Sequence, residues 1–490
     1  MRSVTIVFCA ILILCSFSQA QATTIHVPGD SSTIQGGING AVNGDTVLVA
    51  DETYTGLGNR DIDFGGKGVV LKSENGPDVT IIDCQGSSSD PHRAFHFHSG
   101  EDSTTVVDGF TIQGGYGPFD DPVGHSVGGG IKCDSSSSPK IINNIIIGNS
   151  AREGGGIYCY ESNPSINNNT ISENSADSRG GGIYCYLSNP SINNNTISGN
   201  SAVVTGGGIE CQLYSNPTIS NNTISGNSTT ASGGGGINCF IDSSPTISTN
   251  TISGNSAYFG GGIACVSSSN PTIINNTIRE NSADVSGGGI SCGYRSNPTI
   301  SNNTVSGNSA DEGGGIYCRN DSDPTLENCI IAFSAQGEAV FCFDGTSNPT
   351  LTCCDVYGNG GGDWVDCIAD QADTNGNFSL DPLFCDMATG DFQLDVFSPC
   401  RASSPFNTCG VLIGALDVGC DLGFMSGDAN GDGEVNIGDV VYLVSYLYKA
   451  GPAPVPTPVG DVNCDGLINV GDIVYLVNYL FRGGPPPCEP

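Results

Sequence analysis

Oxygen-bearing side chains recur at a fixed spacing in two segments near the C-terminus. In each segment they occupy positions 1, 3, 5, 9 and 12 of a 12-residue loop, with glycine at position 6 and a backbone carbonyl available at position 7. Hard carboxylate and amide oxygens at this spacing select Ca²⁺ over softer metals. The sequence therefore predicts two calcium ions, one in each loop. The expected ligands are Asp428, Asn430, Asp432, Glu434, Asn436 and Asp439 in the first loop, and Asp461, Asn463, Asp465, Leu467, Asn469 and Asp472 in the second.

An apolar segment follows each loop and is expected to be helical, over residues 440–448 and 473–481. Each loop ends in aspartate rather than the glutamate of an EF-hand, and a dipeptide ending in glycine, not a helix, precedes it. These departures and the duplication resemble a type I dockerin over about residues 427–481, within a domain expected at 427–490. The resemblance implies calcium-dependent docking on a cohesin-like partner domain. Cys464 lies inside the second loop and Cys488 in the tail, and we expect them to form a disulfide.

Four tyrosines occupy equivalent places in two adjacent repeats of the chain, Tyr158 and Tyr160 in one and Tyr184 and Tyr186 in the next. If the repeats stack as strands about 4.8 Å apart, the four rings form a flat aromatic patch suited to stacking on sugar rings. A cross-strand ladder of tyrosines that only stabilises the sheet is the alternative.

Charged side chains occur in the turns near these tyrosines. Glu153 and Asp177 are candidates for acid and base roles in catalysis, and Arg152 and Arg179 are candidates for binding the ligand. Neither a paired-aspartate motif nor an arginine and lysine constellation of known pectin-degrading enzymes is present, so catalysis is an open hypothesis. With so few basic residues, binding of a polyuronate is expected to need bridging Ca²⁺.

A histidine-rich segment, residues 92–98, is a second candidate locus. In a strand, Phe95 and Phe97 share one face while His96 and His98 share the other. The two histidines with Asp90 or Glu101 could bind a metal. The competing interpretation is an exposed strand beside a core lined by phenylalanine.

The elements that position these residues are set by a repeat. Gly-Gly-Gly-Ile recurs eight times between residues 128 and 316, at steps of 26 to 28 residues. A fixed period of this kind indicates a stacked architecture in which each unit buries its apolar side against its neighbours. Three short isoleucine-bearing stretches separated by turn residues fit one coil of a parallel β-helix.

Stacking places equivalent side chains in columns along the axis. The cysteine two residues after each repeat isoleucine shares its inward face, so the sequence predicts an internal cysteine ladder, either free thiols that act as small apolar groups or bridged pairs. An asparagine column is expected to hydrogen-bond along the axis. The cysteines are Cys133, Cys159, Cys185, Cys211, Cys239, Cys265, Cys292 and Cys318, and the asparagines are Asn149, Asn174, Asn200, Asn227, Asn255, Asn281 and Asn308.

The repeat with its following Ile-x-x-Asn motif resembles the repeat pair of polymorphic outer-membrane proteins. More broadly, residues 23–420 resemble secreted right-handed parallel β-helix proteins of the pectin-lyase-like class, an all-β fold. That scaffold serves lyases, hydrolases, epimerases and adhesins, so the resemblance implies the fold strongly and the function weakly. We expect regular coils over about residues 105–330, a cysteine-rich cap over about 330–420, and a short linker at 421–426.

The N-terminus reads as a secretory signal peptide over residues 1–22, with an apolar run from Val4 to Phe17 followed by small residues. The formal charge of −35 argues against nucleic-acid binding, and no later segment is long and apolar enough to span a membrane. We therefore expect a secreted protein, extracellular or held at a cell surface by a partner.

Two functions fit these features. The first is a modular protein whose β-helix binds, and as a lyase or glycoside hydrolase degrades, an extracellular polysaccharide, while the dockerin-like module attaches it to a partner. The second is a non-catalytic surface or adhesin protein in which the solenoid is a structural rod.

Overall fold

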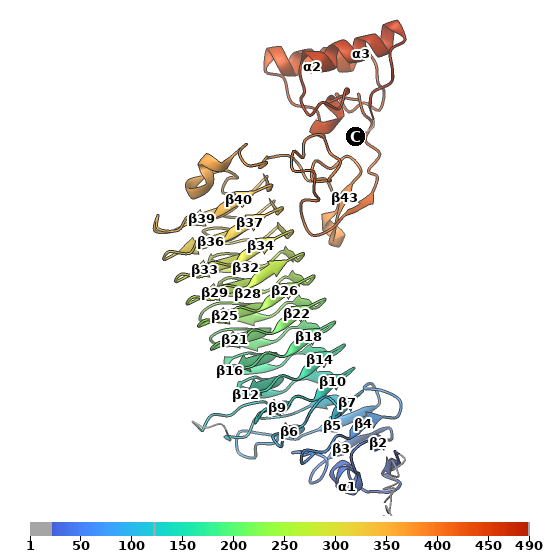
Figure 1. Ribbon diagram of the computed structural model, residues 1–490, viewed down its shortest axis with the longest axis vertical. Coiled ribbons are helices and arrows are strands. Elements are labelled where there is room, and N and C mark those ends of the chain that lie inside the picture. Colours follow the sequence, from blue (N-terminus) through green and yellow to red (C-terminus); the bar gives the residue numbers. More distant parts are fainter. Residues whose placement is uncertain (1–21, 121–123, 489–490) are drawn as a thin grey trace, which may run out of the picture.

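The computed structural model describes residues 22–120 and 124–488, and it shows a long rod of stacked coils with a small helical domain at the C-terminal end (Figure 1). The rod is a right-handed parallel β-solenoid, as the repeat predicts. Apart from Ala22, the expected signal peptide lies outside the described residues. In the part of the chain that is described, no helix is long and apolar enough to cross a membrane.

One sheet carries the Gly-Gly-Gly-Ile motifs, and we call it the cysteine sheet. Its ten strands pair in parallel and in register, with Ile157 beside Ile183 and Cys159 beside Cys185. Its strands are β6 (Phe95–Phe97), β9 (Ile131–Cys133), β13 (Ile157–Tyr160), β17 (Ile183–Tyr186), β21 (Ile209–Gln212), β25 (Ile237–Phe240), β29 (Ile263–Val266), β33 (Ile290–Gly293), β36 (Ile316–Arg319) and β39 (Val340–Cys342).

Two further sheets close each coil around the core. Their strands bury an isoleucine or another apolar residue there. The 13-stranded sheet consists of β1 (Thr24–Val27), β2 (Thr46–Val49), β4 (Val70–Ser73), β7 (Val106–Asp108), β10 (Lys140–Ile142), β14 (Ser165–Asn167), β18 (Ser191–Asn193), β22 (Thr218–Ser220), β26 (Thr246–Ser248), β30 (Thr272–Ile274), β34 (Thr299–Ser301), β37 (Thr325–Glu327) and β40 (Thr350–Thr352). The 12-stranded sheet consists of β3 (Glu52–Thr55), β5 (Thr80–Asp83), β8 (Thr111–Gln113), β11 (Ile145–Ile147), β15 (Thr170–Ser172), β19 (Thr196–Ser198), β23 (Thr223–Ser225), β27 (Thr251–Ser253), β31 (Thr277–Arg279), β35 (Thr304–Ser306), β38 (Ile330–Ala332) and β41 (Asp355–Tyr357).

A six-stranded sheet follows the 12-stranded sheet in the central coils and leads into the glycine motif. Its strands are β12 (Ser150–Glu153), β16 (Ser175–Arg179), β20 (Ser201–Ala202), β24 (Ser228–Thr229), β28 (Ser256–Phe259) and β32 (Ser282–Ser286).

The cysteine ladder runs inside the rod as predicted. All eight ladder cysteines are buried and free, so the bridged alternative is not the one realised. They pack among the isoleucines of the same coils as small apolar groups. Burial raises the pKa of the Cys133 thiol well above its usual range, which keeps the thiol neutral.

Asparagine amides form not one but two buried ladders. The predicted column lies between the 12-stranded sheet and the six-stranded sheet, and a second lies between the 13- and 12-stranded sheets. Except in the last asparagine of each ladder, the amide nitrogen donates to the amide oxygen of the next coil and to a backbone carbonyl of the coil before, as Asn227 does to Asn255 at 3.0 Å and to Ile197 at 2.9 Å. The second column is Asn144, Asn169, Asn195, Asn222, Asn250, Asn276 and Asn303.

The N-terminal end is closed by helix α1 (Ile34–Gly40), whose Ile34 and Ile38 are buried against the first coils. At the other end, coils continue to Tyr357, and the cysteine-rich segment then folds into a cap. The cap contains the short 3-10 helices η1 (Asp366–Gln371) and η2 (Met387–Thr389) and a three-stranded sheet, β42 (Phe384–Asp386), β43 (Asp391–Asp395) and β44 (Val418–Cys420). Three disulfides cross-link the cap: Cys342–Cys367, Cys353–Cys409 and Cys385–Cys420.

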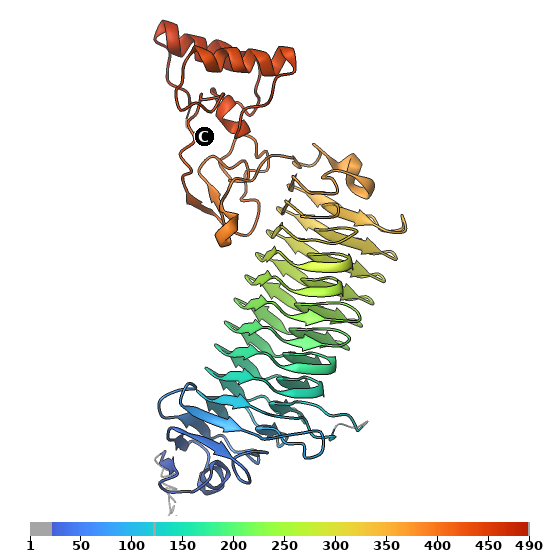
Figure 2. The ribbon, with the colours of Figure 1, turned by 180° about the vertical axis from the view of Figure 1, so that it is seen from behind.

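The C-terminal domain consists of helices α2 (Ile437–Lys449) and α3 (Val470–Arg482), joined by a proline-rich segment and the 3-10 helix η3 (Thr457–Gly460). Both views of the ribbon place it beside the cap (Figures 1 and 2). Val459 of this domain is buried with Leu383 and Phe397 of the cap, so the two parts share a small apolar interface.

The asparagine ladder makes a prediction about stability. Asn227→Ala removes an amide that donates two hydrogen bonds and accepts two from Asn200, and it leaves their buried partners unsatisfied. We expect it to lower the free energy of unfolding by about 2–4 kcal/mol, measured from the shift of the urea unfolding curve. Thr218→Ala, on an exposed position of β22, is the control and should cost less than about 0.5 kcal/mol. Equal losses in the two variants would show that the ladder does not stabilise the rod.

Candidate functional site

The outer face of the cysteine sheet presents two columns of side chains. Because strands alternate, the residues between and after the inward isoleucine and cysteine point away from the core. In-register pairing places Tyr158, Tyr184, Glu210 and Asn238 in one column and Tyr160, Tyr186, Gln212 and Phe240 in the other.

The first column is covered although it points outward. The chain between the six-stranded sheet and the cysteine sheet passes over it, and glycines allow the close approach. A Cβ at Gly180, whose φ is +65°, would lie 2.5 Å from Cβ of Tyr184. As a result Tyr158 and Tyr184 are only 4% and 1% exposed, and Glu210 and Asn238 are buried as well.

The expected patch of four open tyrosine rings therefore needs correction. Tyr158 and Tyr184 pack with Val127 in a small apolar cluster, and their ring centroids are 5.4 Å apart. Tyr160 and Tyr186 are half-buried and lie 5.7 Å apart, so they form the part of the ladder that solvent reaches. Tyr160 and Tyr186 thus form a surface of two accessible rings, which we call the tyrosine ledge, in place of the expected flat surface of four rings.

The four charged candidates near the tyrosines do not converge. Glu153 is buried, with Oε1 at 3.7 Å from Nη1 of Arg179 and 3.9 Å from Nδ1 of His125. Arg152 and Asp177 are exposed, because they occupy the alternate positions of β12 and β16. Glu153 and Asp177 therefore face different surroundings, and the acid and base pair expected from the sequence does not assemble as one site.

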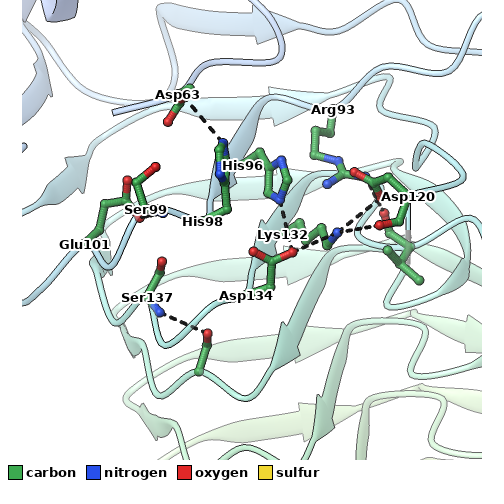
Figure 3. Close-up of polar contacts among 12 residues, drawn as sticks. Asp63, Arg93, His96, His98, Ser99, Glu101, Asp120, Lys132, Asp134 and Ser137 are labelled. Carbon is green, nitrogen blue, oxygen red and sulfur yellow. Dashed lines mark hydrogen bonds and ion pairs between the residues drawn. The ribbon is translucent and has the colours of Figure 1, made fainter. Parts of the chain in front are cut away.

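A cluster of ionisable groups lies at the N-terminal end of the same face (Figure 3). Lys132 Nζ is 2.9 Å from Asp134 Oδ2 and 3.3 Å from Asp120 Oδ1, and Arg93 Nη2 is 2.8 Å from Asp120 Oδ1. His96 Nε2 lies 3.2 Å from Asp134 Oδ2. Burial on its own would raise the pKa of Asp134, but hydrogen bonds from His96 and Lys132 and the charge of Lys132 lower it well below its usual range. Lys132 thus forms ion pairs with two carboxylates.

The histidine segment has the orientation that the sequence predicts, with Phe95 and Phe97 buried in the core and His96 and His98 on the outer face. The expected metal partners are engaged elsewhere. Asp90 pairs with His92 at 3.2 Å, and Glu101 accepts backbone N–H groups of Gly66 and Ser99 at 2.9 Å each. Burial lowers the pKa of His96, so its ring is neutral at pH 7.

Beside this cluster lies a cavity of about 290 Å³. Its walls place a cation, carboxylates and aromatic rings in one small volume open to solvent, a combination that can hydrogen-bond the hydroxyls of a sugar and stack on its ring. It is lined by Asp120, Lys132, Asp134, Ser135, Tyr158, Tyr160 and Glu161.

Sequence reasoning missed Glu210. This carboxyl stands in the outward column where the two preceding coils have tyrosine, and Asn238 Nδ2 donates to both of its oxygens at 3.0 and 2.9 Å. Burial raises the pKa of Glu210 to about 8, although hydrogen bonds from Thr205 and Asn238 and the charge of Arg179 lower it in part. The change from tyrosine to glutamate within Gly-Ile-x-Cys was the one signal that could have revealed it.

The two acidic loops of the C-terminal domain have the form expected for divalent-cation sites. Asn436 and Asn469 cap α2 and α3, and Asp439 and Asp472 complete the capping boxes, so both loops end on a helix as predicted. Within residues 22–120 and 124–488, no group of three or more His, Cys, Asp or Glu side chains is arranged to hold a metal.

The oxygen-bearing side chains of the two loops nevertheless suit Ca²⁺. Asp472 Oδ1 is buried and has no hydrogen-bond partner, as an oxygen reserved for a cation would be. Burial, followed by the charges of Asp472 and Asp465, raises the pKa of Asp461. The disulfide Cys464–Cys488 ties the second loop to the tail, with a Cα–Cα distance of 6.1 Å, and is the pairing expected from the sequence.

Comparisons with known proteins divide the chain in the same way. A family model described as the right handed beta helix region matches residues 10–214, 202–313 and 261–378, and one described as the dockerin type I domain matches residues 426–481. No curated protein matches the chain.

Two solved structures align with part of this chain. A mutant of the PL6 family alginate lyase AlyGC aligns at 15% identity and a TM-score of 0.38, over 68% of this chain and 51% of that one, so the chain spans about half the length of that lyase. A mannuronic acid specific polysaccharide family 6 lyase from human gut microbiota aligns at 14% identity and a TM-score of 0.35, over 69% of this chain and 87% of that one.

Glu210 predicts a pH dependence of stability. Its pKa is raised to about 8 in the folded chain from an ordinary value near 4.5, so folding favours the protonated form. The resulting stabilisation is complete below pH 4.5 and is lost as the pH rises from there through 8. Glu210→Gln, which keeps the shape without the charge, should resemble the wild type at pH 5 and unfold at a higher urea concentration at pH 9. Glu173→Gln, at an exposed carboxyl, is the control. Unfolding midpoints at pH 9 that coincide for Glu210→Gln and wild type would contradict the burial of a neutral carboxyl.

The loop ligands predict a loss of metal binding. Asp428→Ala combined with Asp461→Ala removes the position-1 carboxylate of each loop, and we expect Ca²⁺ uptake measured by titration calorimetry to fall below detection while the rod stays folded by circular dichroism. Asp417→Ala plus Asp421→Ala removes the same charge outside the loops and should leave uptake unchanged. Undiminished Ca²⁺ uptake by the first double variant would refute the ligand assignment.

Proposed function

Because this chain belongs to the right-handed β-helix family and ends in a dockerin type I domain, we propose that it is a secreted protein that binds an extracellular polysaccharide. The dockerin type I domain carries this proposal, since such domains serve to attach a companion module to a cohesin-bearing partner. The companion module here is a rod, and the outer face of its cysteine sheet carries aromatic and charged residues.

The glycan is proposed to lie along the outer face of the cysteine sheet. Tyr160 and Tyr186 supply two solvent-reached rings about one coil apart, and Lys132 and Asp134 beside them supply a cation and a carboxylate in the 290 Å³ cavity. Rings for stacking and fixed polar groups for orientation are the parts that a sugar site requires.

We propose that this face binds the glycan, and we do not propose that Glu153 and Asp177 cleave it. Glu153 is paired with Arg179, and Asp177 is exposed on the far side of its strand. Lys132 Nζ is engaged in ion pairs with Asp120 and Asp134. A non-catalytic adhesin is the second candidate, and the separation of these groups favours it over an enzyme.

Attachment is proposed to run through the C-terminal domain. With two Ca²⁺ bound at Asp428 to Asp439 and Asp461 to Asp472, the domain would present the exposed apolar positions of α2 and α3 to a cohesin. The Asp428→Ala, Asp461→Ala variant tests this step, because it should lose binding to immobilised cohesin and keep binding to glycan.

The tyrosine ledge predicts the effect of a double substitution. Tyr160→Ala plus Tyr186→Ala removes both solvent-reached rings, and we expect affinity for the bound polysaccharide to fall about 10-fold or more in affinity electrophoresis against a panel of extracellular polysaccharides. Tyr448→Ala, which removes an exposed ring from α2, is the matched control and should migrate as wild type.

Four results decide between the candidates. Retarded migration without release of product supports the adhesin, and release of product from the same glycan supports an enzyme. Unchanged migration of the tyrosine double variant would make the ledge structural, and a wild type that no member of the panel retards would contradict the proposed function.

A further inference from the structure

The two acidic loops of the C-terminal domain share one ligand pattern but have different surroundings. Gly433 and Gly466 stand at position 6 of the first and the second loop, with φ of +85° and +82°. A Cβ at Gly433 would meet nothing within 4 Å, whereas a Cβ at Gly466 would lie 2.7 Å from the carbonyl oxygen of Pro405. Pro405 belongs to the cap of the rod. The turn of the first loop is therefore open, and the turn of the second loop is seated on the cap.

The segment that leads into the second loop is also packed on the cap. Val459 of η3, two residues before the first expected ligand Asp461, is 1% exposed. It lies in one apolar cluster with Leu383 and Phe397 of the cap. Phe424 packs on Phe397 as well, with their ring centroids 6.4 Å apart. The cap thus contacts both the second loop and the chain that enters it.

The linker expected at residues 421–426 runs along this interface and is fixed at both ends. Leu422 N–H donates to Oδ2 of Asp395 in the cap at 2.5 Å. Gly427 N–H donates to the carbonyl oxygen of Val459 at 2.9 Å. The path of the linker therefore depends on whether the C-terminal domain stays docked.

The interface is incompletely filled. A cavity of about 530 Å³ remains between the two parts, with Val396 and Phe397 of the cap on one side and Val435 and Tyr479 of the C-terminal domain on the other. Val435 belongs to the first loop, so an open space lies where the second loop has direct contact. Small interfaces between domains permit relative motion unless further contacts hold them. The contacts at the second loop are therefore important for keeping this interface closed.

A cation in the second loop would strengthen those contacts. Without one, the carboxylates of Asp461, Asp465 and Asp472 carry charge of the same sign within a single 12-residue loop, and they repel one another. A bound Ca²⁺ neutralises that repulsion and orders the loop. The turn at Gly466 is then held in the shape that fits against Pro405.

We propose that calcium binding in the second loop and docking of the C-terminal domain on the cap strengthen each other, while the first loop binds calcium independently of the cap. Linkage makes the effect reciprocal, because the factor by which calcium favours docking is also the factor by which docking favours calcium at that loop. The inference rests on the calcium sites of the proposed function and adds that the two sites are not equivalent. Both views place α2 and α3 on the side away from the cap (Figures 1 and 2), so docking leaves the helices accessible to a partner and fixes the direction in which they face.

Titration calorimetry of full mature chains with one intact loop tests the coupling. Asp428→Ala leaves only the second loop able to bind Ca²⁺, and Asp461→Ala leaves only the first. Phe397→Ala is added to each chain, because it removes a ring from the cap side of the interface and belongs to neither loop. We expect it to raise the dissociation constant for Ca²⁺ about 5-fold or more in the Asp428→Ala chain and to leave it unchanged in the Asp461→Ala chain.

Phe392→Ala is the matched control. Phe392 is also a buried ring of the cap, but it packs with Phe384 in the cluster that faces the rod and not with Val459. We expect this substitution to leave the calcium affinity of both single-loop chains unchanged. Circular dichroism of each variant checks that the rod is folded.

Limited proteolysis gives a readout that needs no substitution in the cap. Chymotrypsin cuts after apolar residues such as Leu422 and Met425 of the linker, which are 44% and 47% exposed. We expect EGTA to speed cleavage of the wild-type linker about 5-fold or more, measured by mass spectrometry of the fragments. In Ca²⁺, the Asp461→Ala chain should be cut as fast as the wild type in EGTA, and the Asp428→Ala chain as slowly as the wild type in Ca²⁺.

The results separate this inference from the proposed function. An equal effect of Phe397→Ala on both single-loop chains, no effect on either, or equally fast cleavage of both chains overturns the coupling and leaves two independent calcium loops. Absence of Ca²⁺ uptake by the wild type contradicts the calcium sites of the proposed function, and the coupling falls with them.

Discussion

In-register stacking of one coil on the next is the constraint on which the rest of this molecule depends. Parallel strands place Ile157 beside Ile183 and Cys159 beside Cys185, and the asparagine amides repeat the same step, each donating to the amide of the following coil. Buried amides without such partners would cost several kcal/mol, so the ladders hold the coils at a single register. The interior is therefore nearly invariant along the axis.

An invariant interior leaves the outer face free to vary. The first outward column of the cysteine sheet changes from Lys132 through Tyr184 and Glu210 to Ala264 without any change in the core beneath it. Large residues fill the space under the covering chain, and small ones open a cavity. The side chains that distinguish one coil from the next therefore lie in these outward columns, one coil apart along the axis.

The period of the repeat and the spacing of the calcium loops were sufficient to predict the fold, the inward cysteines and both C-terminal helices. They could not predict which outward-pointing side chains are covered by another segment of the chain. Tyr158 and Tyr184 alternate outward as expected, yet glycine turns such as Gly180 let the chain cover them. The same cover buries Glu210. Alternation along β12 and β16 buries Glu153 and exposes Asp177, so the acid and base pair drawn from sequence proximity did not assemble. The second asparagine ladder was not predicted, although its residues recur with the same period as those of the first.

The state of the thiols tests the stacking most directly. Among the described residues, twelve cysteines are free and buried, and eight form four disulfides. Titration of the mature protein with a thiol reagent should therefore find almost no reactive group in the native state and twelve after unfolding in guanidinium without reductant. Reactive thiols in the native protein, or four or fewer after unfolding, would mean that the ladder is exposed or bridged, and the in-register account would be wrong.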